Sequence, residues 1–158
     1  MAISKFTLYG ASLAQLKALC EELGLPRFAH KQIARWLYSR FVSDIDAMTD
    51  LSKAARETLK QNCELGLSAP LKESVSADGT KKYLFRTSQG EYIESAYIPD
   101  GERATLCVSS QAGCRMGCRF CATGRQGLQH SLSTTEIINQ ILSIPESERL
   151  TNLVFMGM

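Results

Sequence analysis

A short loop with three cysteines is the feature that most constrains this chain. It reads GCRMGCRFC from Gly113 to Cys121, so the cysteines follow a C-x3-C-x2-C pattern and are Cys114, Cys118 and Cys121. Thiolates are the natural ligands of iron–sulfur clusters, and three thiolates on so short a loop can converge on one cubane cluster. Three ligands leave one iron of the cubane open, which a reactive cofactor needs and a closed electron carrier does not. The loop therefore predicts a reactive iron–sulfur site.

Structural zinc is the main alternative for these cysteines. His130 could join them in a Cys3His set, and a zinc knuckle would fit a protein that binds nucleic acid. The spacing favours the cluster, because three residues separate the first two cysteines and His130 is isolated from any second ligand pair. A disulfide framework is disfavoured because the loop holds an odd number of cysteines.

The residues around the loop predict an α/β repeat. A predicted strand, ATLCVSS, precedes the cysteine loop of residues 110–121. Ser133 or Thr134 caps a predicted helix over 135–143, and Asn152–Met156 (NLVFM) has the composition of a buried strand. This order of elements is typical of a parallel βαβ unit. Such a unit leaves sheet edges open and faces half covered, so we expect residues 110–158 to be a truncated core.

Turn signals predict an antiparallel β segment before the loop. Asp78-Gly79 separates LKESVS from KKYLFR, and this dipeptide is a strong hairpin signal. Gln89-Gly90 leads into EYIESAYI, and a third turn at 99–101 leads into ATLCVSS. Residues 71–109 are therefore predicted to form a small meander, within a segment bounded at 69–109.

Residues 12–64 have a helical pattern, and we assign residues 1–68 to a helical accessory domain. Ser12 and Gln15 form a capping box at the first helix, which Gly24 and Pro26 end. A second helix is predicted over Lys31–Phe41, and a third begins near Ser52. The side chains predicted to face inward are Leu13, Leu16, Leu19, Cys20, Leu23, Ile33, Trp36, Leu37, Phe41, Ala55, Leu59 and Cys63. The predicted fold class is thus α+β followed by α/β.

Composition excludes few functions. The chain has 158 residues, of which 44% are hydrophobic and 22% charged, as in ordinary globular proteins, and its net charge is +2. It contains neither an apolar stretch long enough to span a bilayer nor the apolar core of a secretory signal. We therefore expect a cytoplasmic protein, in which clustered cysteines bind metal or act in catalysis.

Basic residues on the predicted helices leave nucleic-acid binding open. Helical spacing groups Lys31 with Arg35, and it also groups Lys53, Arg56 and Lys60. With Arg40 these side chains could form a face for phosphates. The opposite interpretation is a solvated surface, balanced by the acidic residues Asp44, Asp46, Asp50 and Glu57.

The longer sequence around the loop resembles a known family. TLCVSSQAGCRMGCRFCATGRQG is similar to the signature of the RlmN/Cfr family of radical S-adenosylmethionine (SAM) RNA methyltransferases. KQIARWLYSRFVSDIDAMTDLSKAARETL resembles the family's N-terminal helical region, and ADGTKKYLFRTSQGEYIESAYIPDGERATLCVSS resembles its β segment. STTEIINQI and NLVFMGM resemble the first helix and next strand of the core. The resemblance covers nearly the whole chain and implies the start of a partial (β/α) barrel.

The resemblance implies methylation of C2 of adenosine in 23S rRNA and in the tRNA anticodon loop. The resemblance also implies a [4Fe-4S] cluster and SAM as cofactors and a protein such as flavodoxin as electron donor. It further implies that the protein is a monomer and does not bind membranes. Radical chemistry suits this target, because C2 of adenine is not a nucleophile. A sister activity in the family methylates C8.

The family's pattern continues beyond VFMGM into a Gly-Glu pair that binds SAM and, later, a methyl-carrying cysteine. This chain contains neither, so we expect it to be inactive alone. The alternative is a non-catalytic remnant that binds metal and RNA.

The resemblance also implies roles for individual residues. Cys114, Cys118 and Cys121 would be the cluster ligands, and Phe120 could pack against the adenine of SAM. Glu94 matches the family's proton acceptor, although a lone glutamate on a strand is more often simply solvated. Cys107 matches the cysteine that pairs transiently with the methyl-carrying cysteine, although free cysteine is commonly a small buried hydrophobe. Core roles are expected for Cys20, Cys63 and Trp36, and no role is expected for His30 or His130.

Overall fold

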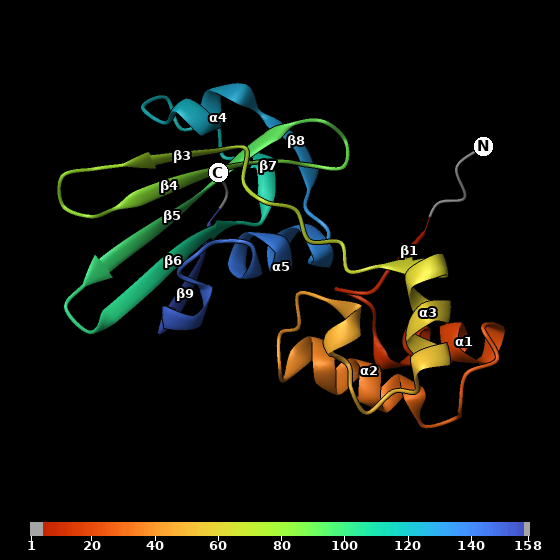
Figure 1. Ribbon diagram of the computed structural model, residues 1–158. Coiled ribbons are helices and arrows are strands. Elements are labelled where there is room, and N and C mark those ends of the chain that lie inside the picture. The colour runs from red at the N-terminus through yellow and green to blue at the C-terminus, as the bar shows by residue number, and fades with distance from the viewer. Residues whose placement is uncertain (1–4, 157–158) are drawn as a thin grey trace. The chain divides into compact units, whose positions relative to one another are not determined.

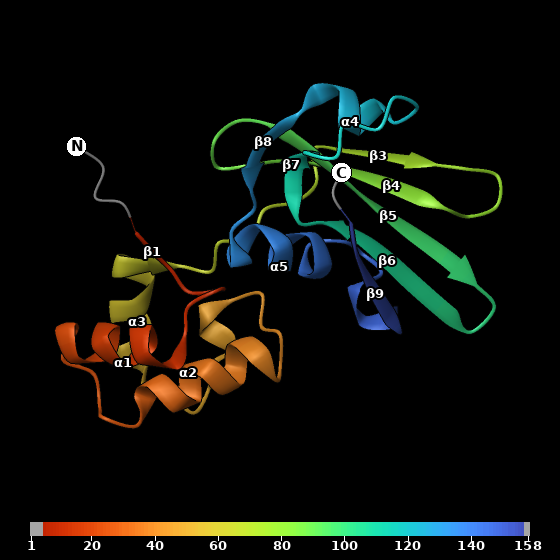
Figure 2. The ribbon, with the colours of Figure 1, turned by 180° about the vertical axis from the view of Figure 1, so that it is seen from behind.

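A computed structural model describes residues 5–156 of the chain. The chain divides into two compact units, residues 1–67 and 68–158, which are described separately. Figures 1 and 2 show the ribbon from opposite sides. None of the helices within residues 5–156 is both long enough and apolar enough to cross a membrane.

The first unit is built from short helices, as the sequence predicts. Its elements are β1 (Phe6–Thr7), α1 (Leu13–Glu22), α2 (Ala29–Tyr38), the 3-10 helix η1 (Ile45–Ala47), α3 (Lys53–Asn62) and β2 (Cys63–Glu64). The predicted capping box of Ser12 and Gln15 is present, and Ser52 caps α3. Strands β1 and β2 form a parallel pair that joins the two ends of the unit, with Phe6 opposite Cys63. The sequence pattern did not reveal this pair.

Two predicted core positions of this unit are wrong. Leu13 is exposed, because a helical side chain leans towards the N-terminus and Leu13 is the first residue of α1. Phe41 is exposed because α2 ends at Tyr38, and Phe41 has a left-handed backbone (φ 49°) that takes it off the helical stripe. The remaining core includes Leu16, Leu19, Cys20, Ile33, Leu37, Ala55, Leu59 and Cys63.

The second unit is α+β and contains a five-stranded mixed sheet in the order β3-β4-β5-β6-β9. These strands are β3 (Lys72–Val75), β4 (Lys81–Arg86), β5 (Tyr92–Asp100), β6 (Arg103–Ser109) and β9 (Asn152–Met156). The first four strands pair antiparallel, which confirms the predicted meander. Strand β9 pairs parallel to β6 after the crossover helix α5 (Thr134–Leu142) and the 3-10 helix η2 (Ser147–Arg149), which confirms the predicted βαβ unit.

One face of this sheet carries the core of the unit. Tyr83, Phe85, Leu106 and Val108 are fully or almost fully buried there. Ile137 and Ile141 of α5 pack against this cluster. Because side chains alternate along a strand, the intervening residues point to the other face. Lys82, Glu94 and Cys107 belong to that second face, and all three keep solvent exposure.

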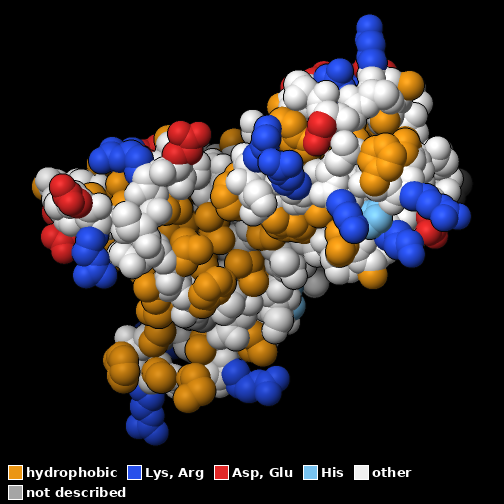
Figure 3. Space-filling view, turned by 90° about the horizontal axis from the view of Figure 1, so that it is seen from below, with side chains coloured by type: hydrophobic (Ala, Val, Ile, Leu, Met, Phe, Trp, Pro, Cys, Tyr) orange, Lys and Arg blue, Asp and Glu red, His pale blue; other side chains and the backbone are white. Residues whose placement is uncertain are grey.

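The prediction that β9 is a buried strand is wrong for this structure. Its four apolar residues, Leu153 to Met156, are all exposed. Strand β9 lies at the edge of the sheet, and β6 is its pairing partner within residues 5–156. The apolar composition of an edge strand therefore produces an exposed patch, and hydrophobic side chains gather on this unit in Figure 3.

The cysteine loop lies within a small substructure that the sequence did not predict. Strands β7 (Gln111–Gly113) and β8 (Leu128–Ser131) form an antiparallel pair, and the short helix α4 (Ala122–Gln126) lies between them in the chain. The helix α5 follows with a capping box of Ser133 and Glu136.

Candidate functional site

The pair β7–β8 holds the two ends of the cysteine loop together. The amide of Cys114 donates to the carbonyl of Gly127 at 3.1 Å. Gly113 has a left-handed backbone (φ 74°), and a Cβ atom there would lie 1.8 Å from the Gly127 oxygen. Glycine is therefore required at 113, and its lack of a side chain lets the loop close directly beneath Cys114.

A tight turn connects the second and third cysteines. The amide of Cys121 donates to the carbonyl of Cys118 at 3.1 Å, and the guanidinium of Arg125 donates two bonds to the carbonyl of Arg119, at 3.2 and 3.0 Å. Helix α4 packs closely on this turn, because a Cβ atom at Gly124 would lie 2.9 Å from the amide nitrogen of Cys118. These contacts hold Cys118 and Cys121 at the two ends of one turn.

The chemistry of these thiols fits a cluster site. All three loop cysteines are free and half-buried. The pKa of the Cys121 thiol is lowered by hydrogen bonds from the amide of Gly124 and from Thr123, which outweigh the opposing effect of desolvation. The thiolate is the form that binds metal, so this environment favours a ligand.

The structure does not bring the three sulfurs together as a ligand set. Within residues 5–156 no group of three or more His, Cys, Asp or Glu side chains is arranged to hold a metal ion. The assignment of Cys114, Cys118 and Cys121 to a cluster therefore stays a prediction. It is supported by three soft donors on one closed loop.

His130 has a different neighbour from the one that the zinc alternative requires. It lies on β8 opposite Ala112, and its Nδ1 is 3.5 Å from Oε2 of Glu91. The pKa of Glu91 is lowered, chiefly by the hydrogen bond from the Thr87 hydroxyl and in part by His130. This placement gives the Cys3His arrangement no support.

Phe120, the residue predicted to pack against adenine, is 93% exposed. Met116, in the same loop, is 79% exposed. The tip of the loop thus presents apolar side chains to solvent, and the role of Phe120 in binding adenine stays a prediction.

Glu94 and Cys107 lie on the same uncovered face of the sheet. Cys107 of β6 is opposite Ala96 of β5, and Glu94 is two residues from Ala96 along the same strand. Oε2 of Glu94 accepts a hydrogen bond from Nζ of Lys82 at 2.9 Å, and both side chains are about half exposed. Sequence reasoning missed Lys82, although its place opposite Ala96 on β4 could have been read from the hairpin register.

The basic residues that the sequence predicts to form a face for phosphates lie in two places, on α3 and on or just after α2. On α3, Nζ of Lys60 is 2.8 Å from Glu57 and 3.0 Å from Asp46, and Arg56 donates to the carbonyl of Asp46 at 2.7 Å. Near α2, the guanidinium of Arg40 stacks on the ring of Trp36, 4.3 Å from its centroid. Of the α3 cations, Lys60 is thus neutralised within the unit by two carboxylates.

Exposed aromatic residues flank α2. Phe28, Tyr38 and Phe41 are exposed, and Lys31 and Arg35 lie on the helix between them. Figure 3 shows hydrophobic side chains interleaved with Lys and Arg on this unit. Trp36 is half-buried and its indole Nε1 donates to Asp50, and its expected core role stays a prediction.

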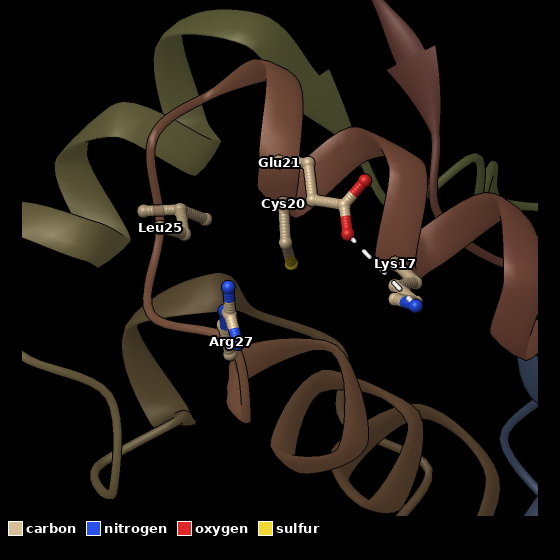
Figure 4. Close-up of a pocket in the computed structure, with 5 residues that line it drawn as sticks. All are labelled: Lys17, Cys20, Glu21, Leu25 and Arg27. Atoms are coloured by element: carbon tan, nitrogen blue, oxygen red, sulfur yellow. Dashed lines mark ion pairs between the residues drawn. The ribbon is translucent and has the colours of Figure 1, made fainter.

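A separate hollow of about 310 Å³ lies on the helical unit (Figure 4). It is lined by Lys17, Cys20, Glu21, Leu25 and Arg27. An ion pair of 3.9 Å joins Lys17 to Glu21 across its rim, and burial raises the pKa of the Cys20 thiol. The hollow contains none of the residues predicted to act in the site.

Comparison with known proteins points to one group. Residues 6–65 match the family "Ribosomal RNA large subunit methyltransferase N-terminal domain". The chain is 56% identical over its whole length to a probable dual-specificity RNA methyltransferase RlmN of Phocaeicola vulgatus, covering 45% of that protein. It is 54% identical over 99% of its length to the corresponding protein of Bacteroides thetaiotaomicron, again covering 45%.

A solved structure agrees with these relatives. The crystal structure of a radical SAM methyltransferase from Sphaerobacter thermophilus matches 97% of this chain with a TM-score of 0.81 and 40% identity. The match covers 47% of that protein. The chain thus spans less than half the length of these similar proteins.

Proposed function

The chain belongs to the RlmN family over the residues that it shares with these relatives, and from this premise we propose that it is part of a radical SAM methyltransferase of RNA. The target we propose is C2 of adenosine in 23S rRNA and in the tRNA anticodon loop. The observation that carries the proposal is the closed cysteine loop between β6 and α5. In this proposal, β6, α5 and β9 form the first repeat of a partial (β/α) barrel.

The proposal gives the cysteine loop the role of holding a [4Fe-4S] cluster through Cys114, Cys118 and Cys121. When bound, the cluster and SAM supply radical chemistry, which can act at a carbon that is not a nucleophile. Phe120 would pack against the adenine of SAM, and reducing electrons would come from a donor protein such as flavodoxin. The chain would act as a monomer.

The uncovered sheet face would supply the remaining groups. Glu94 would accept a proton from the substrate carbon, and Lys82 supports this role by holding one carboxylate oxygen. Cys107 would pair transiently with the methyl-carrying cysteine of the family, which matches none of the cysteines in this sequence. The location of Glu94 and Cys107 on one face supports their acting on one substrate.

RNA would bind the helical unit on the α2 side. Single-stranded RNA is commonly held by cations together with aromatic rings on which bases stack. Lys31, Arg35 and Arg40, with the exposed rings of Phe28 and Phe41, provide both features. The α3 cations are less suited, because Lys60 is already paired with two carboxylates.

Anaerobic reconstitution followed by iron and sulfide analysis tests the cluster. The expected result is about four irons and four sulfides per chain, with loss of the cluster in Cys114→Ala, Cys118→Ala and Cys121→Ala. Cys107→Ala is the matched control, since it removes a neighbouring half-buried thiol that the proposal does not use as a ligand. Stoichiometric zinc without iron, lost in His130→Ala, would overturn the radical SAM assignment.

A mobility-shift titration with tRNA and a 23S rRNA fragment tests the RNA surface. Lys31→Ala combined with Arg35→Ala is expected to weaken binding and lower the salt dependence by about two counterions. Lys53→Ala combined with Lys60→Ala removes the same formal charge from α3 and is expected to have a smaller effect. Equal weakening by both pairs would show that α2 has no special role.

A further inference from the structure

Gln140 of α5 is a fully buried amide that is bound to the end of β6. Its exposed fraction is 0%. Its Oε1 accepts from the amide of Ser109 at 2.9 Å, and its Nε2 donates to the carbonyl of the same residue at 3.0 Å. Nε2 also donates to the carbonyl of Glu136 at 3.2 Å. A side-chain amide is needed here because the site requires a donor and an acceptor together.

We call Ser109 and Ser110 the serine junction. It connects this amide to strands β5 and β9 and to Leu132, the residue that follows β8. The hydroxyl of Ser109 donates to the carbonyl of Glu94 at 2.7 Å. The amide of Ser110 donates to the carbonyl of Met156 at 2.8 Å, and the carbonyl of Ser110 accepts from the amide of Leu132 at 3.0 Å. The junction is the last chain segment before β7 and the cysteine loop, so contacts from β5, from β9 and from the residue that follows β8 meet where the loop starts.

We propose that Gln140 and Ser109 are positioning residues that fix the start of the cysteine loop relative to the strand carrying Glu94. The consequence for catalysis rests on the proposed function, whereas the positioning itself does not. Leaving the buried amide and carbonyl of Ser109 without partners would be unfavourable, so loss of the Gln140 amide should open the junction. Neither residue needs to touch a cofactor to have this effect.

The neighbouring residue Asn139 provides a matched control. It is also a buried amide on α5, and its Oδ1 accepts from the amide of Ser68 at 2.7 Å. Its Nδ2 donates to the hydroxyl of Ser68 at 3.1 Å. Gln140→Leu and Asn139→Leu thus each remove a buried amide from one helix, but only the first removes contacts with the serine junction.

Native-state hydrogen exchange of the 158-residue chain tests the positioning. We expect Gln140→Leu to speed hydrogen exchange at the Ser110, Cys114 and Leu132 amides. The acceleration there should be at least about tenfold larger than at amides of β4 and β5 that exchange only by global unfolding. Asn139→Leu should speed all of these amides equally. Equal acceleration by Gln140→Leu would overturn the proposal, because the amide would then only stabilise the fold.

Ser109→Ala tests the hydrogen bond to Glu94 separately from the hydrogen bonds to Gln140. It is expected to perturb the junction less than Gln140→Leu does. It keeps both backbone bonds to Gln140 and removes the bond to Glu94, so exchange at Leu132 should stay as in the unmodified chain. The amide signals of Glu94 and its neighbours on β5 should shift. Unchanged β5 signals would exclude Ser109 as the link between the loop and Glu94.

A cluster readout adds a functional arm. In the reconstituted chain, Gln140→Leu should alter the EPR g-values of the reduced cluster, whereas Asn139→Leu should not. If no cluster forms in any chain, the proposed function fails and the exchange result still decides the positioning. If the cluster forms and both variants give the unmodified spectrum, Gln140 does not position the loop.

Discussion

The two faces of the mixed sheet differ in what their residues do. The face under α5 holds large buried side chains such as Tyr83 and Leu106, and Glu146, from the segment that follows α5, accepts a hydrogen bond from the Tyr83 hydroxyl there. Alternate residues of the same strands point to the opposite face. That face carries Glu94 and Cys107, which are accessible to solvent. One backbone thus supports a face that stabilises the unit and a face that is free for chemistry.

This difference teaches how to separate stability from function in this fold. A side chain buried among others cannot change without a loss of packing, whereas a half-exposed one can. Residues that are neighbours in sequence, such as Thr105 and Leu106, should therefore differ in how strongly their substitution lowers the stability of the unit. Variants paired across the two faces test the division directly.

The largest expected effect is on packing. Leu106→Ala should lower the free energy of unfolding of the sheet unit by about 2 to 5 kcal/mol, because Leu106 is fully buried. Thr105→Ala, one residue away on the other face, should change it by less than about 1 kcal/mol. Urea unfolding followed by circular dichroism measures both. Fluorescence of Trp36, the single tryptophan, follows the helical unit and should be unaffected. Similar losses for both variants would break the comparison.

Thiol reactivity extends the comparison to the cysteines. Burial raises the pKa of Cys63 to about 11, while hydrogen bonds from Gly124 and Thr123 lower the pKa of Cys121. In the metal-free chain at pH 7.5, Cys121 should react with iodoacetamide at least about a hundredfold faster than Cys63. Cys107, which is half-exposed, should fall between them. Peptide mapping over time measures the rates, and a Cys63 as fast as Cys121 would contradict the structure.

Acid stability tests the polar part of the packed face. Burial raises the pKa of Glu146, but hydrogen bonds from Lys81 at 2.7 Å and Tyr83 at 2.6 Å outweigh it and leave this pKa below its ordinary value. A carboxylate with a lowered folded-state pKa stabilises above its unfolded value of about 4.5, and this stabilisation is lost as pH falls through the folded value. Glu146→Gln should lower the free energy of unfolding by about 1 to 3 kcal/mol at pH 7. It should also make the free energy of unfolding fall less steeply as the pH is lowered.

The control for this carboxylate is Glu94→Gln on the open face. It removes a half-exposed group, so the unfolding curve at pH 7 should stay close to that of the unmodified chain. An acid-stability profile of Glu146→Gln identical to the unmodified profile would show that Glu146 does not contribute.

Local signals predicted much of this fold from the sequence. The capping box at Ser12, a helix cap at Ser133 or Thr134 and the turn at Asp78-Gly79 depend on a few adjacent residues, and the structure contains all three, with Ser133 as the cap. The pair β7–β8 was missed because it joins residues 111–113 to 128–131 across the cysteine loop, and neither strand has a periodicity long enough to detect. The exposure of β9 was missed because composition predicts burial but not the place of a strand in a sheet.

The candidate site could be predicted less completely. The spacing of the cysteines identified the loop, but the requirement for glycine at Gly113 arises from its approach to Gly127 and is visible only in three dimensions. The roles of Glu94 and Cys107 stay predictions from family resemblance. Their common face follows from the register of β5 and β6, which the sequence left open.

The ion pair between Lys82 and Glu94 on the open face should contribute least to stability. A variant of this pair therefore gives the sharpest test of the difference between the two faces. Lys82→Met removes the partner of Glu94 but keeps the aliphatic part of the side chain. Exposed ion pairs contribute little, so the free energy of unfolding should change by less than about 0.5 kcal/mol. The carboxyl carbon of Glu94 should nevertheless shift in NMR spectra, since its partner at 2.9 Å is lost.

Lys72→Met is the matched control for this last variant. Lys72 lies opposite Leu84, which in turn lies opposite Glu94, so it occupies the same row one strand further away. Its loss should leave the Glu94 signal in place, and raising the salt concentration should move the unmodified chain towards the Lys82→Met spectrum. A loss of stability above about 1 kcal/mol in Lys82→Met would mean that the open face is also structural, and the division between the two faces would fail.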